Sequence, residues 1–261
     1  MRVPEGVKRV VRPVRELALR LATARSGLGR VVNGIEYRVD SRCRHQFAPE
    51  YEAAAAGFLC KHIAPGAVVY NVGANVGVLT VQLARWTGPR GRVVAFEPNP
   101  YAAGLLKRNL RLNRLDSQVE IVGAAIGDTV GDVMLHVSGA NGMARVMRAN
   151  PLLPNTEAVR VPVTTLDRFS DGRQLKPGWI VMDIEGWEVA ALRGGRELFS
   201  ATEVGVVIEL HPDAWSWSGD SRADLERILV ELRRRPIALS GQMDPLAEYG
   251  QVYLESRTGA Q

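Results

Sequence analysis

The sequence predicts an α/β protein built around a mostly parallel β-sheet. Short apolar runs typical of buried strands alternate, along residues 67–210, with segments whose apolar positions recur at helical spacing. Helices between successive strands require right-handed crossovers, which produce a parallel sheet covered on both faces. A glycine-rich turn over residues 71–77 also follows the first of these strands and opens a helix, as in many α/β ligand sites. These three observations define the fold class.

The individual elements follow from this alternation. Strands are expected at residues 67–72, 92–97, 119–122, 179–184 and 204–210, and helices at residues 50–63, 76–86, 102–113, 188–199 and 222–234. A final pair of strands is expected at residues 236–239 and 251–255. Residues 123–166 interrupt the alternation, with extra strands at 133–137 and 159–163 around a loop over 141–154 that we expect to lie over a cleft.

An N-terminal extension over residues 1–48 is expected to precede the main domain over residues 49–261. Residues 31–39, with the turn pair Asn33-Gly34, predict a β-hairpin within it. A helix is predicted before the hairpin, because apolar residues recur at three- and four-residue steps: Val7, Val10, Val11, Val14, Leu17, Ala18 and Leu21. Two interpretations of this helix stay open. It packs on its own domain and leaves a basic face in solvent, or residues 1–30 contact an anionic membrane surface or a partner.

The net charge of +5 is concentrated in this extension. Residues 1–30 hold eight basic and two acidic side chains, whereas the rest of the chain holds 25 basic and 26 acidic ones. A nearly neutral main domain does not favour a nucleic-acid partner. No N/D-P-P-Y/F motif of nucleic-acid methyltransferases follows the fourth core strand either.

Composition excludes several other classes. No apolar run is long enough to cross a bilayer, and no signal peptide is expected, because the first 30 residues lack a continuous apolar stretch. Only two cysteines, Cys43 and Cys60, are present, which is too few for a disulfide framework and favours a reducing, cytoplasmic location.

The glycine turn predicts a nucleoside site. Its glycines, Gly73 and Gly77, allow a ligand to approach the backbone, and Glu97 ends the next strand, where a carboxylate can accept both hydroxyls of a ribose. The dinucleotide fingerprint is not matched, since Asn75 and Val78 occupy its second and third glycine positions. An NAD-dependent oxidoreductase is therefore a less favoured alternative to an enzyme whose nucleoside cofactor carries no phosphate.

Five segments, in this order, resemble the FkbM-type methyltransferases: VVYNVGANVGVLT, VVAFEPNPYAAGLLKRNLRLN, AAIGDTVGDVMLHV, VPVTTLDRF and IVMDIEGWEVAALRGG. The resemblance covers about residues 50–255. It implies a class I, Rossmann-like sheet of seven strands with the last strand antiparallel, and S-adenosylmethionine (SAM) as cofactor. The implied activity is methyl transfer to a hydroxyl of a sugar, polyketide or similar natural product.

The resemblance also implies a set of cofactor-binding residues. Gly73, Asn75 and Gly77 would form the SAM turn and Glu97 would hold the ribose. The others are Asn99, Ala124 and Ala125 around the adenine, Asp183 near the methionine part and the substrate, and Glu52 as a weaker candidate for the amino-acid end. The family usually has an acid where this chain has Asn71, and an amide cannot supply negative charge to the cofactor's ammonium group. A non-catalytic SAM-binding or scaffold protein is thus the alternative from a different class.

Catalytic candidates lie at the ends of the later strands. An alcohol acceptor benefits from a base that removes its proton, and His211, Asp183 and Glu185 are the candidates. Two of these also have a structural interpretation: His211 as a hydrogen-bonded structural histidine and Glu185 as a helix cap. Nearby Glu188 is expected to complement the helix dipole.

The substrate side is expected to involve Trp187, Glu209, Trp215 and Trp217. Two tryptophans in a polar loop suggest either a platform for a sugar ring or apolar substrate, or a lid packed on the core. Arg145 and Arg148 are expected to meet an acidic substrate or to stay solvated. Asp183, Glu185, Glu209 and His211 offer oxygen and nitrogen ligands for a metal. A metal is not expected, however, because the paired-aspartate motif of magnesium-dependent methyltransferases is not evident.

Overall fold

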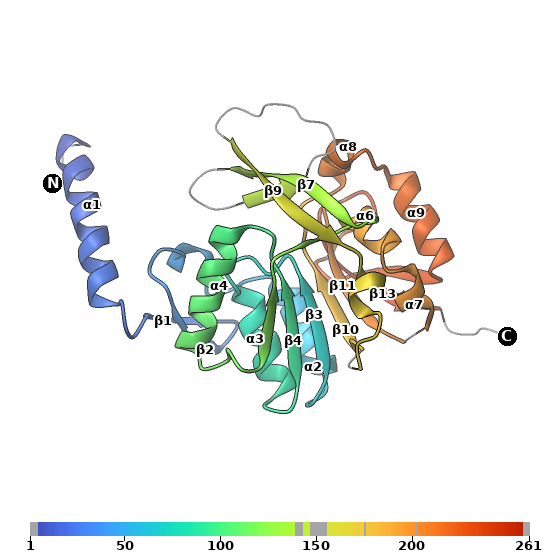
Figure 1. Cartoon of the computed structure of the whole chain (residues 1–261), viewed down its shortest axis with the longest axis horizontal. Helices are drawn as coiled ribbons and strands as arrows, with labels where there is room; N and C mark the ends of the chain where they lie inside the picture. The colour runs from blue at the N-terminus through green and yellow to red at the C-terminus, as the bar shows by residue number, and fades with distance from the viewer. Residues whose placement is uncertain (1–4, 139–142, 147–155, 175, 202, 258–261) are drawn as a thin grey trace.

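The computed structural model describes residues 5–138, 143–146, 156–174, 176–201 and 203–257. Its centre is a seven-stranded sheet of order β12-β13-β11-β10-β3-β4-β5, with helices on both faces (Figure 1). The strands β5, β4, β3, β10 and β11 run parallel, and β13 is antiparallel to both of its neighbours. The bounds are β3 Val68–Val72, β4 Arg92–Phe96, β5 Val119–Val122, β10 Trp179–Met182, β11 Gly205–Leu210, β12 Arg234–Ala238 and β13 Gly250–Ser256. The predicted fold class and the antiparallel last strand are confirmed.

Two cores, one on each face of the sheet, hold the layers together. Successive strand residues point to opposite faces, so Val69 and Val93 pack on one side with α2–α4 while Tyr70 and Val94 pack on the other with α5–α7 and α9. The helices are α2 Ala53–His62, α3 Val78–Thr87, α4 Pro100–Leu112, α5 Leu166–Ser170, α6 Glu188–Arg193, α7 Arg196–Ala201, α8 Trp215–Ser218 and α9 Arg222–Glu231. Short 3-10 turns span Arg44–Gln46 and Pro212–Ala214.

One expected helix is divided. The single helix predicted over residues 188–199 is wrong, because Gly194 and Gly195 separate α6 from α7. A Cβ atom on Gly194 would lie 1.9 Å from the carbonyl oxygen of Gly127. The chain therefore uses glycine here to pass close to a neighbouring backbone.

A second sheet interrupts the alternation, as expected for residues 123–166. It has four strands in the order β6-β9-β7-β8, with bounds β6 Ala125–Ile126, β7 Gly131–Ser138, β8 Met143–Val146 and β9 Thr156–Thr164. The loop expected over residues 141–154 is wrong for residues 143–146, which form β8 and pair with β7. The remainder of that loop, Arg148 included, lies outside the described residues.

The N-terminal segment joins the main body through its hairpin. Strands β1 Leu28–Val32 and β2 Ile35–Val39 pair across the Asn33-Gly34 turn, and Val32 is completely buried in the core that also contains α2–α4. The boundary between residues 48 and 49 stays a prediction.

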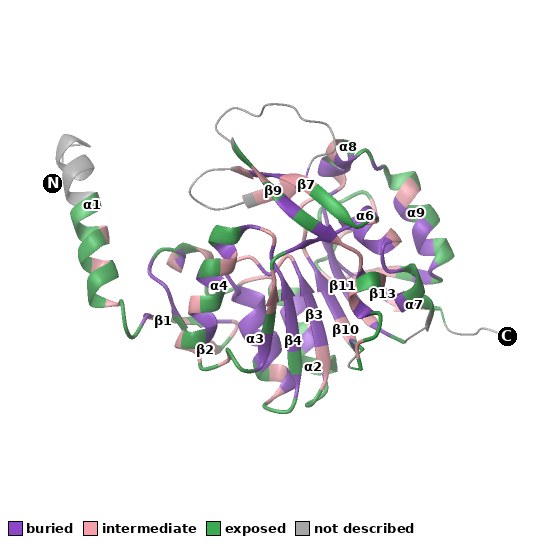
Figure 2. Ribbon diagram, in the orientation of Figure 1, coloured by how far each residue is buried: buried purple, intermediate pink, exposed green. Residues whose placement is uncertain are grey.

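Helix α1 (Glu5–Ala22) stands clear of the body at one side of the molecule (Figures 1 and 2). Its residues Val14, Leu17 and Leu21 are exposed. For the described side chains of this stripe, the interpretation in which the helix buries its apolar face on its own domain is therefore wrong. Within the described part of the chain, no helix is both long and apolar enough to span a membrane.

Candidate active site

The candidate site is a pocket at the carboxyl ends of the central strands. Strands β3, β4 and β10 end at it, and β7 and β8 of the second sheet supply another wall. Its polar residues come from the ends of the central strands, whereas the second sheet contributes apolar side chains. The lining is formed by Val72, Gly73, Asn75, Phe96, Glu97, Pro98, Ala124, Ala125, Ile126, Leu135, Ala144, Val146, Asp183, Ile184, Glu185 and Trp187.

The glycine turn crosses very close to the end of strand β10. Gly73 has φ of 86°, and a Cβ atom there would lie 1.8 Å from the carbonyl oxygen of Asp183, so no other residue fits. The backbone N–H of Asn75 points to Glu97, 2.6 Å from Oε2. Gly77 has a different function: a Cβ there would lie 2.5 Å from Leu106, so this glycine lets α3 pack against α4 and does not line the pocket.

Glu97 is buried, with 6% of its surface exposed. Burial raises the pKa of its carboxyl group to about 7, although hydrogen bonds from the backbone of Asn99 and Asn75 act in the opposite direction. Each carboxylate oxygen has a second lone pair available for a ligand hydroxyl. Asn99 itself caps α4 by accepting a bond from the N–H of Tyr101, and its buried Nδ2 has no hydrogen-bond partner among the described residues.

Asn71 does not reach the pocket. Its side chain is buried and donates a hydrogen bond of 2.8 Å to Oγ1 of Thr80 in α3. The amide is therefore engaged inside the structure, and the negative charge near the pocket comes from other residues.

A cluster of carboxylates surrounds His211 beside the pocket. Its Nε2 lies 3.7 Å from Oδ1 of Asp183, 3.8 Å from Oε2 of Glu185 and 3.7 Å from Oε2 of Glu209. Glu52, in the left-handed backbone conformation before α2, belongs to the same cluster because its charge acts on Asp183. The strand-end rule brought the first four of these residues together, as expected.

The cluster is rich in negative charge. Burial by itself lowers the pKa of His211, but the hydrogen bond to Glu188 and the neighbouring carboxylates outweigh it and raise the value to about 9. Burial, followed by the charge of Glu209, raises the pKa of Glu52 to about 7. Burial and the charges of Glu209 and Glu52 also raise the pKa of Asp183 well above its usual range. A further positive charge placed here would be stabilised.

Glu188, which the sequence did not suggest as a site residue, contacts His211. Its side chain is completely inaccessible to solvent, and its Oε1 accepts bonds from the N–H of Gly186 at 2.7 Å and from Nδ1 of His211 at 2.9 Å. Its Oε2 accepts a bond of 2.8 Å from Nε1 of Trp215. The sequence placed Glu188 in the first helical turn, where acids are common, and gave no sign that the turn faces the interior.

The two tryptophans of the expected platform are separated. Trp215 has 2% of its surface exposed and packs in the core, whereas Trp217 is half-buried. The guanidinium carbon of Arg145 lies 5.2 Å from the centre of the Trp217 ring, and the same arginine pairs with Glu185 at 2.9 Å. Trp187 is buried and lines the pocket. Trp187 thus lies in the wall of the pocket, and Trp217 lies beside the arginine that pairs with the pocket residue Glu185.

The cluster also contains side chains that could bind a metal ion, and an aromatic ring lies next to it. Asp183, Glu209 and His211 each offer one ligand atom, and these atoms lie within 4.8 Å of one another, a donor set that divalent cations accept. Tyr249, which the sequence did not suggest, lies beside His211, with 5.2 Å between the ring centres and the ring planes tilted by 59°.

Comparison with known proteins adds the family. The model of the FkbM methyltransferase domain matches residues 71–236. A protein-L-isoaspartate O-methyltransferase of Caenorhabditis elegans is 27% identical over 128 residues, which cover 49% of this chain and 53% of that relative. The AMB antimetabolite synthetase AmbE of Pseudomonas aeruginosa is 44% identical over 64 residues, 24% of this chain and 3% of the synthetase. This chain therefore matches about half of the first relative and a small part of the second.

A solved structure agrees with the fold. The methyltransferase FkbM of Methylobacillus flagellatus KT aligns with a TM-score of 0.50 and 20% identity over 72% of this chain and 43% of its own. The match of the family model begins at the strand that leads into the glycine turn and includes Glu97, Asp183 and His211. The chain belongs to the FkbM family of methyltransferases.

Proposed function

We propose that this protein is a SAM-dependent O-methyltransferase that acts on a hydroxyl of a sugar, glycoside or polyketide-type natural product. One observation carries the proposal: Glu97, aimed at the glycine turn, and Asp183, beside His211, line the same pocket. A nucleoside carboxylate and a candidate base are thereby brought to a single cavity.

The residues present fit SAM. The buried Nδ2 of Asn99 and Oδ1 of Asp183 have no hydrogen-bond partner in the described part of the chain, and buried polar atoms normally require one. Glu97 would hold the ribose, Ala124 and Ala125 would lie along the adenine, and Asp183 with Glu52 would face the cationic methionine part. When bound, SAM supplies a methyl group attached to a positively charged sulfur.

The carboxylate cluster compensates for Asn71. Since that amide donates to Thr80, it contributes no charge to the pocket. Asp183, Glu52 and Glu209 would supply the negative charge instead. Burial, together with the neighbouring carboxylates, raises the pKa values of Asp183 and Glu52, and His211 offsets this only in part. A cationic cofactor would favour the ionised form of both groups.

His211 is the proposed general base. The bond from its Nδ1 to Glu188 fixes the ring and leaves Nε2 directed toward Asp183 and Glu185, which line the pocket. A proton removed from an acceptor hydroxyl would be received at Nε2. Asp183 and Glu185 are the alternative bases, and Glu185 is the less available because Arg145 pairs with it.

The acceptor would enter from the side of Trp187 and Trp217. Aromatic faces suit sugar rings and other apolar surfaces, and Glu209, 3.7 Å from Nε2 of His211, offers a hydrogen-bond acceptor in the adjoining cluster. The two relatives found by sequence, a protein-L-isoaspartate O-methyltransferase and an antimetabolite synthetase, support an oxygen acceptor and a natural product. The thiols of Cys43 and Cys60 are free, which agrees with the cytoplasmic location that we propose.

The first experiment is calorimetric titration of the protein with SAM, S-adenosylhomocysteine and NAD. We expect binding of the first two and none of NAD; binding of NAD alone would overturn the proposal. The second is methyl transfer from labelled SAM across a panel of hydroxylated sugars and polyketides, with and without a chelator. If the protein binds SAM tightly but methylates no acceptor of the panel, the scaffold alternative is favoured.

A further inference from the structure

Helix α1 presents an apolar face that nothing in the described structure covers. Val14, Leu17 and Leu21 are 65%, 58% and 70% exposed, and with exposed Ala18 they lie at the spacing of one helix face. Large apolar side chains gathered on one exposed face indicate an interaction surface. Arg15 and Arg20 are exposed on the same helix.

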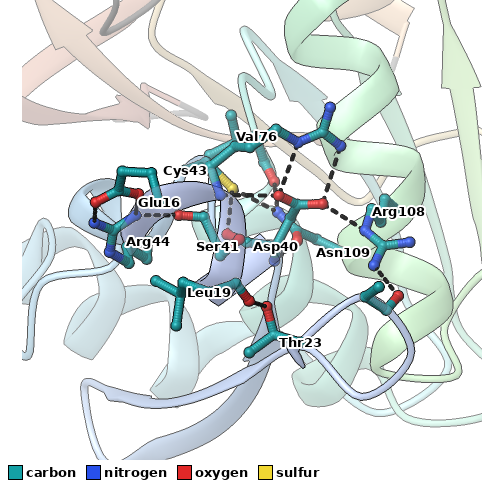
Figure 3. A network of polar contacts seen from close by, with 12 residues as sticks. Glu16, Leu19, Thr23, Asp40, Ser41, Cys43, Arg44, Val76, Arg108 and Asn109 are labelled. Carbon is teal, nitrogen blue, oxygen red and sulfur yellow. Dashed lines mark hydrogen bonds and ion pairs between the residues drawn. The ribbon is translucent and has the colours of Figure 1, made fainter. Parts of the chain in front are cut away.

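Polar contacts hold the base of α1 against the body (Figure 3). Glu16 pairs with Arg44 at 2.7 Å, and Arg108 of α4 binds the carbonyl oxygen of Ala24 just beyond the helix. Gly27, which follows the helix, is buried, and a Cβ atom at this position would lie 2.9 Å from the side chain of Leu112. The helix is therefore attached at its C-terminal end while its apolar face remains in solvent.

A basic groove begins at the same place. It is formed by residues that follow α1, by β2 and by one face of α4: Arg25, Ser26, Arg38, Gly104, Lys107, Arg108, Arg111, Leu112 and Arg114. Within the described structure Arg108 is bound to Asp40, whereas the exposed Lys107, Arg111 and Arg114 have no ion pair. Although the main domain is nearly neutral, its charge is segregated, with carboxylates at the pocket and cations here.

We propose that α1 and this basic groove form a docking surface for an anionic phospholipid bilayer. The apolar face of α1 would enter the boundary between headgroups and acyl chains, and the cations of the groove would lie over lipid phosphates. The two parts are contiguous because Arg25 and Ser26 of the groove directly follow α1. The proposal concerns attachment and does not depend on which acceptor is methylated.

The exposed apolar face favours a bilayer over the other occupants. Nucleic acid would use the cations and leave Val14, Leu17 and Leu21 in water. A second copy of the chain would cover the apolar face but would bring a second basic groove near the first, which is repulsive. A bilayer of acidic lipid satisfies both parts with one ligand.

The test is co-sedimentation of the full chain with vesicles of phosphatidylcholine alone or of equal parts phosphatidylcholine and phosphatidylglycerol. We expect binding to the acidic vesicles only, weakened by salt because the cations are exposed. The double variants Leu17→Asp/Leu21→Asp and Lys107→Glu/Arg111→Glu should each reduce binding by about tenfold or more. Val230→Asp in α9 and Arg90→Glu are matched controls, since both positions are exposed and lie away from the groove.

Several outcomes would overturn the proposal. One is absence of binding to acidic vesicles, and another is equal binding by the Leu17→Asp/Leu21→Asp variant. Sedimentation of a dimer that this variant dissociates, without vesicle binding, would assign the face to a second copy. Binding of duplex DNA in place of vesicles would assign the groove to nucleic acid. SAM titration and thermal unfolding of each variant show whether it is folded, so loss of vesicle binding stays distinct from loss of the proposed enzyme function.

Discussion

Nδ1 of His211 lies 2.9 Å from Oε1 of Glu188, a carboxylate with no solvent-accessible surface. Because an ionised carboxylate only accepts hydrogen bonds, the ring proton must reside on Nδ1, and Nε2 is the atom left for chemistry. The arrangement is that of a buried acid orienting a histidine base. Glu188 is therefore a positioning residue in the proposed mechanism.

Replacing Glu188 tests this relationship. In Glu188→Gln the amide NH₂ would face one of three N–H donors that now bind the carboxylate. We expect kcat to fall by about 10–100-fold and stability to fall by about 2 kcal/mol, the cost of unsatisfied buried polar groups. NMR titration of His211 should show a lower pKa, which a purely structural role would not require. Glu203→Gln, at an exposed position, is the control; an unchanged His211 pKa in Glu188→Gln would contradict the assignment.

The pH dependence of turnover follows from the cationic histidine. Because the neighbouring carboxylates raise the pKa of His211 to about 9, the base is protonated at neutral pH in the free enzyme. A raised pKa means that the active, neutral form gains population as pH rises toward 9. We expect kcat/KM for SAM to increase about tenfold from pH 7 to 8 and about fivefold from pH 8 to 9, where the rise begins to level off. The pKa seen in kcat should be lower, since a cation beside His211 opposes its protonation.

His211→Ala should remove this rise and lower kcat by about 10²–10³-fold, the usual contribution of a general base. The affinity for SAM should change little. A profile identical to that of the natural enzyme would transfer the role to Asp183 or Glu185.

SAM affinity should depend on Glu97 in a different pH range. Burial raises the pKa of Glu97 to about 7, and only the ionised form accepts from both ribose hydroxyls. The ionised fraction falls about tenfold between pH 8 and pH 6, so the Kd measured by calorimetry should rise by about that factor. Glu97→Gln should bind SAM about tenfold more weakly at pH 8 and show a smaller pH dependence, which comes from Glu52, whose pKa is also about 7. A pH effect of unchanged size in Glu97→Gln would exclude Glu97 as its origin.

Much of the fold could be predicted because it follows from local periodicity. Buried strands, intervening helices and the glycine turn each leave a signal within a few residues, and the parallel direction of the core strands follows from the crossovers between them. The break at Gly194-Gly195 was also visible as a glycine pair, but the apolar periodicity on either side concealed it. Strand β8 gave no such signal, because its pairing with β7 depends on tertiary context.

The candidate site was only partly predictable for the same reason. Strand ends share one edge of a sheet, so the proximity of Asp183, Glu209 and His211 could be expected. Burial of Glu188 could not, because an acid in a first helical turn has the same sequence signature in solvent and in a core. The exposed face of α1 could not be predicted either. The spacing of its apolar residues predicts a helix but does not show whether the apolar face is buried.

Asp40 should contribute acid-sensitive stability. Burial would raise the pKa of its carboxyl group, but hydrogen bonds from Arg42 and the charges of Arg42 and Arg108 lower it to about 2. A lowered pKa stabilises the fold above pH 4, and the contribution disappears as pH falls from 4 to 2. With allowance for solvent screening of the arginines, we expect Asp40→Asn to cost about 1 kcal/mol at pH 7 and nothing near pH 2. Denaturant unfolding at both pH values measures this, with exposed Asp116→Asn as the control; an equal cost at both would contradict the charge-based explanation.

Comparing Gly73 with Gly88 separates the cost of an unusual backbone conformation from the cost of a close contact. Gly73 and Gly88 both have positive φ, 86° and 65°, but a Cβ on Gly73 would lie 1.8 Å from the carbonyl oxygen of Asp183 whereas one on Gly88 meets no atom within 4 Å. Gly88→Ala should therefore cost only its backbone strain, about 1–3 kcal/mol, because φ of 65° with ψ of −179° is a conformation that essentially only glycine adopts. Gly73→Ala must in addition push the turn away from β10, and we expect a loss above about 3 kcal/mol together with loss of SAM binding. If thermal unfolding and SAM titration showed the two variants to be equivalent, the close contact between the glycine turn and Asp183 would not be what holds the pocket in shape.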